Sequence, residues 1–235
     1  MAGILFIISA PSGSGKSTIV NELRSQVSGL DFSVSWTTRG PRGSEQNSRD
    51  YQFTTREHFE EMIRQGEFLE YAEVFGNYYG TPRRALNDAF SRGKDLLLDI
   101  DVQGASQVRR KMPEAVSIFL MPPSPDILAY RLKSRSRADG SVTDADINRR
   151  LAKAKQEIEN YREYGYILVN DILERAVEEM AAIVAAERYR RNGAVNGSAD
   201  SQRLIKIAEG CRQENSEARI RPVLRAFGVL EGSKQ

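Results

Sequence analysis

Short apolar runs alternate along the chain with segments of helical spacing. The first run, Gly3–Ser9, contains several β-branched residues and leads into a loop rich in glycine and serine. Beyond the loop, Val20, Leu23 and Val27 recur at the spacing of one helix face. Similar apolar runs, each preceded by a helix-like segment, lie at 95–101, 116–121 and 166–169. The alternation predicts an α/β fold with a central parallel sheet flanked by helices on both faces.

Between Phe32 and Thr81 the pattern departs from this alternation. The segment contains shorter and more polar strands around 56–65, which differ from the continuous apolar runs of the central sheet. We therefore expect an inserted mixed-β subdomain at about 35–85.

A second departure lies at 134–143, which is polar, basic and glycine-containing. It separates two helices that we expect at 125–133 and 144–164. Such a segment between helices predicts a small mobile lid at about 134–150.

The C-terminal part follows a last predicted helix at 172–191. Residues 192–198 have the composition of a flexible linker, so we expect the fold to be complete before them. This gives one domain over 1–190 and a tail over 191–235 whose role the sequence does not indicate. Apolar residues in the tail predict short amphipathic turns, and no motif in it carries recognisable chemistry.

Charge and cysteine content exclude several classes of protein. The 235 residues include 34 basic and 32 acidic side chains, a net charge of +2 that argues against nucleic-acid binding. One cysteine, Cys211, and one histidine, His58, form neither a disulfide nor a zinc site. The run at 3–9 is too short to span a membrane and lacks a basic leader. We expect a cytoplasmic protein without membrane contact, and a homo-oligomer stays open.

The loop after the first strand matches the phosphate-binding P-loop pattern, with alanine in place of the first glycine. Its residues are Ala10, Pro11, Ser12, Gly13, Ser14, Gly15, Lys16 and Ser17. Gly13 and Gly15 let backbone N–H groups turn toward an anion at a helix N-terminus, and Lys16 supplies a point charge. The Ser17 hydroxyl is a candidate ligand of Mg²⁺. A Ser/Gly-rich turn that only caps a helix is the alternative, and the flanking strand and helix favour an ATP site.

Two arginines mark a candidate site for a second phosphate. Arg39 and Arg42 are three residues apart in a loop rich in threonine and glycine, and two guanidinium groups can clamp a monophosphate. Tyr51 and Tyr79 would add hydroxyl donors. A solvated basic turn is the alternative interpretation.

Two carboxylates end a predicted strand. Asp99 and Asp101 alternate after an apolar run, which predicts that both lie on one face at the carboxyl edge of the parallel sheet. They could be phosphatase metal ligands or strand-end caps. The phosphate loop favours Asp99 as a partner of hydrated Mg²⁺, leaving Asp101 for the acceptor.

Four stretches together resemble guanylate kinase, over about Gly3 to about Arg190. They are Phe32-Ser33-Val34-Ser35-Trp36-Thr37-Thr38-Arg39-Gly40-Pro41-Arg42, Asp50-Tyr51-Gln52-Phe53, Gly76-Asn77-Tyr78-Tyr79-Gly80-Thr81-Pro82 and Leu98-Asp99-Ile100-Asp101-Val102-Gln103-Gly104. The resemblance implies the fold of a P-loop nucleoside monophosphate kinase. It also implies transfer of the γ-phosphoryl group of ATP to GMP, and to dGMP, with Mg²⁺, in purine nucleotide metabolism and GMP recycling.

Several site residues follow from this resemblance. It implies that Glu70 and Asp101 bind guanine, whose N1–H and 2-amino groups need acceptors, with Ser35 near O6 and Thr81 in the same site. It makes Arg131, Arg135 and Arg150 lid residues that act on the transferring phosphoryl group, and places Asn170 on the adenine side. Ser44 and Ser48 stand where the family often has glycine.

Two other functions remain as alternatives. Guanylate-kinase-like domains also occur as inert modules that bind phosphorylated peptides, but those typically lose the phosphate loop. A related kinase could act on another small phosphorylated acceptor, such as a ribose bisphosphate. Glu70 together with Asp101 favours guanine over a sugar.

Overall fold

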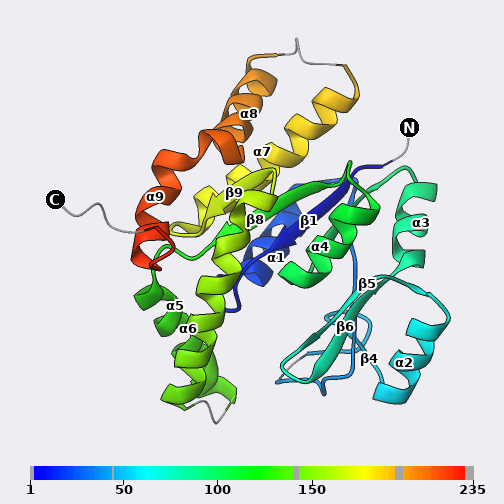
Figure 1. Cartoon of the computed structure of the whole chain (residues 1–235). Coiled ribbons are helices and arrows are strands. Elements are labelled where there is room, and N and C mark those ends of the chain that lie inside the picture. Colours follow the sequence, from blue (N-terminus) through cyan, green and yellow to red (C-terminus); the bar gives the residue numbers. More distant parts are fainter. Residues whose placement is uncertain (1–2, 44, 140–142, 194–197, 231–235) are drawn as a thin grey trace. The chain divides into compact units, whose positions relative to one another are not determined.

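The computed structural model describes residues 3–43, 45–139, 143–193 and 198–230 (Figure 1). The fold contains a central parallel sheet flanked by helices and a separate mixed sheet, as the sequence predicts. The chain divides into two compact units, the first made of Met1–Ile8 with Gly29–Ser117 and the second of Ser9–Ser28 with Ile118–Gln235. Across the described residues, no helix is long and apolar enough to cross a bilayer.

In the first unit, three parallel strands lie in the order β2 (Leu30–Phe32), β7 (Asp95–Asp99) and β1 (Leu5–Ser9). Every residue of β1 is buried, and β7 is buried up to its last residue. Burial on both faces explains why these strands appear in the sequence as continuous apolar runs.

The first unit also contains a separate mixed sheet, but the prediction of strands around 56–65 is wrong, because Phe59, Met62 and Ile63 recur at helical spacing and this segment forms a helix. The strands of the mixed sheet lie in the order β4 (Gln52–Phe53), β3 (Trp36–Thr37), β6 (Asn77–Pro82) and β5 (Phe68–Val74). Phe75 and Gly76 connect β5 to β6, and both have positive φ, as the primed turns of tight hairpins require.

Three helices complete the first unit, namely α2 (Arg56–Arg64), α3 (Arg83–Ser91) and α4 (Val102–Lys111). The side chain of Thr55 caps α2 by accepting a hydrogen bond from the His58 amide. Phe59 and Met62 of α2 pack on Phe68 of β5 and form the core of the subdomain.

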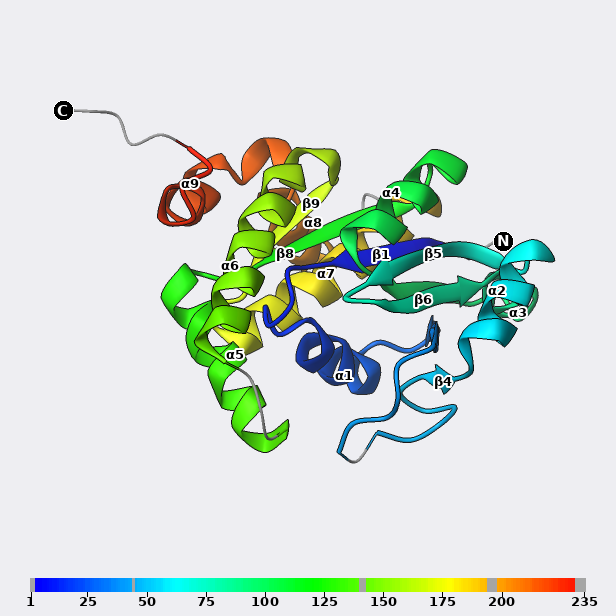
Figure 2. The same ribbon diagram turned by 60° about the horizontal axis from the view of Figure 1, so that its bottom comes forward.

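The second unit contains the parallel strands β8 (Val116–Met121) and β9 (Tyr166–Val169), paired from Ile118↔Tyr166 to Met121↔Val169. Its helices are α1 (Lys16–Gln26), α5 (Pro125–Asp139), α6 (Asp144–Glu159), α7 (Leu173–Arg191), α8 (Ala199–Gly210) and α9 (Glu217–Ala226). Short 3-10 helices lie at Asn160–Glu163 and Gln213–Asn215. Helices α5 and α6 lie side by side (Figure 2).

Helix α5 is longer than the sequence predicts. It was expected to end at 133 and continues to Asp139, because 134–139 contains no glycine or proline to stop it. The first part of the predicted lid is therefore helical, and residues 140–142 lie outside the described part of the chain.

The tail after the linker is part of the packed fold, so the expectation that the fold is complete before 192 is wrong. Helix α8 packs against α7. On β9, the Ile167 amide donates to the carbonyl of Cys211 at 2.8 Å, and Arg219 donates to the Ile167 carbonyl at 2.6 Å. The amide of Gln213 donates to the carbonyl of Gly165. These bonds occupy backbone groups of an edge strand that would otherwise be open to another strand.

Side-chain ion pairs reinforce the attachment of the tail. Arg190 of α7 pairs with Glu209 of α8, and Arg212 pairs with Glu187 of α7 at 3.3 Å. Arg212 also lies 4.6 Å from the centre of the Tyr166 ring. Arg203, Arg212 and Arg219 of the tail thus pair with glutamates of α7 inside the second unit.

Candidate active site

The phosphate loop lies where the sequence places it, between the end of β1 and the start of α1. Gly13 and Gly15 both have φ of 91°, a left-handed conformation that other residues rarely adopt. Gly15 is the N-cap of α1, whose first residue is Lys16. The loop therefore ends at the N-terminus of α1, a geometry that favours anions because the first amides of a helix point outward along its axis.

Neighbouring side chains hold the loop in this shape. Asn170 is 4% exposed and its amide donates to the Ser14 carbonyl at 2.7 Å. Arg131 of α5 donates to the Ser14 carbonyl at 3.2 Å and to the Asn170 carbonyl at 2.9 Å, and burial lowers the pKa of its guanidinium. A Cβ on Gly15 would lie 2.3 Å from Nδ2 of Asn170, so only glycine fits there. Both side chains thus contact the loop backbone at Ser14, and their predicted roles toward ATP stay predictions.

The lid residues are only partly described. Arg135 belongs to α5, but its side chain lies outside the described part of the structure. Arg150 is half-buried on α6, a helix that begins with a capping box between Thr143 and Asp146. The predicted action of both arginines on a phosphoryl group stays a prediction.

In the first unit, Arg39 lies at the centre of the candidate phosphate site for the acceptor. Its side chain is 8% exposed and donates through Nε to the Tyr79 hydroxyl at 3.2 Å. Both oxygens of Glu45 accept from one terminal nitrogen, at 3.0 and 2.9 Å. Burial alone would lower the pKa of this guanidinium, but the Glu45 and Tyr79 interactions raise it. Arg39 is therefore a fixed, fully charged cation.

Two further predicted residues join this cluster. The Tyr51 ring lies 5.3 Å from the Arg39 guanidinium and 5.9 Å from the Tyr79 ring. Burial, with the Asp99 carboxylate as the next cause, raises the pKa of the Tyr51 hydroxyl to about 12, so it remains a donor at neutral pH. Arg42 is exposed, and its amide donates to Glu45.

Glu45 orients Arg39 and binds the Arg42 backbone, a role that the sequence pattern did not predict. Its position three residues after Arg42 in a turn was the available signal, but a surface glutamate in such a turn is common. The contact with Arg39 depends on how the loop folds back, which the spacing alone does not reveal.

The candidate base site is built around Glu70 on β5. Its side chain is 3% exposed, and burial raises the pKa of its carboxyl to about 7, while Thr81 opposes the rise and Asp101 adds to it. Thr81 is the cross-strand partner of Glu70 on β6 and is fully buried. Ser35 is half-buried next to β3, and its carbonyl accepts from the Gln52 amide at 2.9 Å.

Asp99 and Asp101 occupy different structural positions. Asp99 is the last residue of β7 and is half-buried. Asp101 is the N-cap of α4, and its carboxylate accepts from the Gly104 amide at 2.9 Å. Asp101 thus caps a helix, and its second oxygen accepts from the side-chain amide of Gln103 at 3.3 Å.

Comparison with known proteins gives a consistent result. The family model described as Guanylate kinase matches residues 3–187. Guanylate kinase of Koribacter versatilis is 53% identical over 97% of this chain and 97% of its own. Guanylate kinase of Vibrio vulnificus is 47% identical over 81% of this chain and 91% of its own.

A solved structure agrees with the sequence matches. The crystal structure of guanylate kinase from Anaplasma phagocytophilum has a TM-score of 0.64 and 36% identity, covering 79% of this chain and 86% of that one. The phosphate loop, the acceptor cluster around Arg39 and the buried Glu70 lie within the matched residues. The chain therefore belongs to the guanylate kinase family.

Proposed function

We propose that this chain transfers the γ-phosphoryl group of ATP to the phosphate of GMP, and of dGMP, giving ADP and the nucleoside diphosphate. The observation that carries the proposal is the buried Glu70 carboxyl beside the start of α4, where Asp101 lies. Guanine presents two neighbouring donors, N1–H and the 2-amino group, and carboxylates are the acceptors that match them. The relatives reported above carry the name guanylate kinase.

The phosphate loop would bind the donor. Backbone N–H groups at Gly13 and Gly15, together with Lys16, would surround the phosphates of ATP at the start of α1. Arg131 and Asn170 support this assignment because both fix the shape of the loop through the Ser14 carbonyl. Such preorganisation avoids the cost of ordering the loop on binding.

The cluster around Arg39 would bind the acceptor phosphate. Arg39 and Arg42 would supply positive charge, and Tyr51 and Tyr79 would donate hydroxyl hydrogen bonds. The acceptor phosphate is already an anion, so in-line attack on the γ-phosphorus needs no strong general base. The chain would act by positioning, by charge from Arg39, Arg135 and Arg150, and by excluding water.

Magnesium is part of the proposal. The Ser17 hydroxyl and the Asp99 carboxylate, the latter through water, are oxygen ligands of the kind that Mg²⁺ prefers. Within the described residues, no three His, Cys, Asp or Glu side chains gather to hold a metal ion by themselves. Phosphate oxygens and water would therefore complete the coordination, and the ion would neutralise charge on the phosphates.

A cytoplasmic location is part of the proposal. It rests on the resemblance and on Cys211, which is buried and has no cysteine partner in the chain. There the reaction would serve purine nucleotide metabolism by returning GMP to the diphosphate level.

The experiment is a coupled assay of ADP formation with Mg²⁺-ATP and each of GMP, AMP, CMP and UMP. We expect a strong preference for GMP, and loss of activity in Lys16→Ala. Lys206→Ala, which removes an exposed lysine of α8 in the same unit, serves as the matched control and should keep full activity. A folded protein that binds ATP but phosphorylates none of the four would overturn the proposal.

A further inference from the structure

Helix α4 and strand β5 contact each other directly at the candidate base site. The Glu70 carboxylate approaches the first turn of α4 so closely that a Cβ on Gly104 would lie 2.2 Å from Oε2 of Glu70 and 3.4 Å from Oδ1 of Asp101. Because Asp101 caps the same helix turn, the position of α4 on β5 sets the separation between the two carboxylates. Any group that fixes this contact therefore also fixes the distance between the Glu70 and Asp101 carboxylates.

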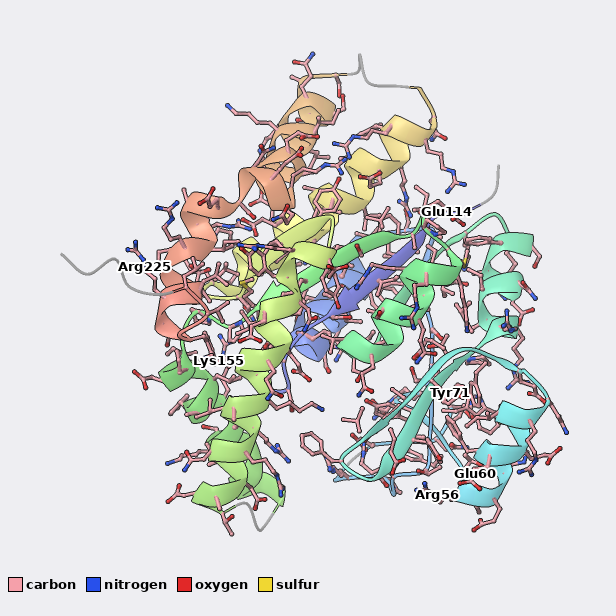
Figure 3. All side chains as sticks on the ribbon, viewed as in Figure 1. Arg56, Glu60, Tyr71, Glu114, Lys155 and Arg225 are labelled. Carbon is pink, nitrogen blue, oxygen red and sulfur yellow. The ribbon has the colours of Figure 1, made fainter. Side chains whose placement is uncertain are left out.

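One turn further along α4, Gln107 binds both backbone groups of the residue after Glu70. Its Oε1 accepts from the Tyr71 amide at 3.3 Å, and its Nε2 donates to the Tyr71 carbonyl at 2.5 Å. Tyr71 is labelled in Figure 3 on β5, an edge strand of the mixed sheet. The side-chain amide thus takes the place that a neighbouring strand would occupy.

A second contact fixes the residue before Glu70. Lys111 donates to the Leu69 carbonyl at 2.6 Å from the C-terminal end of α4. The pairing of β5 with β6 shifts register between Phe68 and Glu70, so Leu69 lies at a β-bulge. Bulges redirect nearby side chains, and here Phe68, Leu69 and Glu70 are all buried instead of alternating. Lys111 therefore holds the bulge that turns Glu70 inward.

Gly104, Gln107 and Lys111 are spaced three and four residues apart and so lie on one face of α4. This face meets three consecutive residues of β5, with Glu70 in the middle. We propose that Gln107 and Lys111 are positioning residues for guanine specificity, which hold Glu70 and Asp101 at the separation that the base requires. The inference rests on the proposed function, because it assigns these residues to the recognition of GMP.

Charge supports the same assignment for Lys111. The charged and titratable groups that act on the Glu70 carboxyl are Asp101 and Lys111 of α4, with the Thr81 hydroxyl across the sheet. Burial and Asp101 raise the Glu70 pKa, and the Lys111 ammonium lowers it. A nearby cation thus favours the ionised carboxylate, which is the form that accepts from N1–H and the 2-amino group.

The test compares Gln107→Ala, Lys111→Met and Lys111→Arg with wild type. For the first two we expect KM for GMP to rise roughly 3- to 10-fold, with kcat and KM for ATP little changed, because each loses hydrogen bonds made only on the base side. The preference for GMP over IMP, which lacks the 2-amino group, should fall by a similar factor. Lys111→Arg keeps a donor and a charge and should restore both values.

Lys111→Met should also move the pH dependence of KM for GMP to higher pH, a change that a merely structural role would not produce. Arg110→Met is the matched control, since it removes one exposed charge from the neighbouring position and should change nothing. Unchanged KM and GMP/IMP preference in both variants would overturn the inference, as would an equal loss of all kinetic parameters. Inactive wild type would instead refute the proposed function.

Discussion

Replacing Glu70 by glutamine tests how the buried carboxyl affects stability and recognition. Glu70 is 3% exposed, and burial raises the pKa of its carboxyl from 4.5 to about 7. Between these values the folded state binds more protons than the unfolded chain, so its stability falls as pH rises through this window. Each unit of difference between the two pKa values is worth about 1.4 kcal/mol. Ionising Glu70 therefore lowers the free energy of unfolding by about 3 kcal/mol once the pH exceeds 7.

Glutamine has nearly the same size and does not ionise, so Glu70→Gln removes this pH-dependent loss. The difference in free energy of unfolding, variant minus wild type, should therefore be about 3 kcal/mol larger at pH 8 than at pH 4.5. Urea unfolding without nucleotide at several pH values measures it. The same substitution places an amide donor against the donors of guanine and should raise KM for GMP by roughly 100-fold or more.

Glu67→Gln provides the matched control, because Glu67 is an exposed glutamate three residues earlier. Its unfolding free energy should follow that of wild type at every pH. A Glu70→Gln protein whose stability keeps a constant offset from wild type across the range would refute the argument that Glu70 is desolvated. Retained GMP preference in that variant would refute its role in binding the base.

Three further predictions concern the tail, the phosphate loop and Arg39. Deleting the chain after Arg191 exposes the edge of β9 and should lower Tm by several degrees, at about 2–4 °C for each kcal/mol lost, in a thermal melt; an unchanged Tm would show that the tail docking contributes nothing. Gly15→Ala forces a side chain into a left-handed backbone beside Asn170 and should raise KM for ATP at least about tenfold, whereas Ser25→Ala, at an exposed position of α1, should not. Glu45→Gln weakens the orientation of Arg39 and should raise KM for GMP roughly tenfold without affecting KM for ATP; an equal effect on both would contradict this role.

The sequence predicts those parts of the fold whose signals are local. The strands at β1, β7, β8 and β9 are buried on both faces, so their apolar runs identify them directly. The phosphate loop is equally local, since its strand, glycines and lysine are consecutive in the chain. These features depend on neighbours in sequence, and the structure confirms their positions.

Long-range contacts could not be predicted in this way. The bond between Asn170 and the Ser14 carbonyl joins residues 156 positions apart, and the Arg39–Glu45 pair depends on how one loop folds back. The tail has interspersed acidic and basic residues that are typical of a solvated helix, yet Arg212 and Arg219 dock it onto β9 and α7. The bulge at Leu69 likewise interrupts the alternation of buried and exposed side chains along β5, so the sequence alone could not predict that Glu70 points inward.

The central claim is that the phosphoryl group goes to GMP and not to water. The most direct measurement is ³¹P NMR of the products formed from Mg²⁺-ATP and GMP by the full-length protein. We predict ADP and GDP in equal amounts, with no inorganic phosphate, and no ADP when GMP is omitted. ADP accompanied by inorganic phosphate, with GMP left unchanged, would contradict the account.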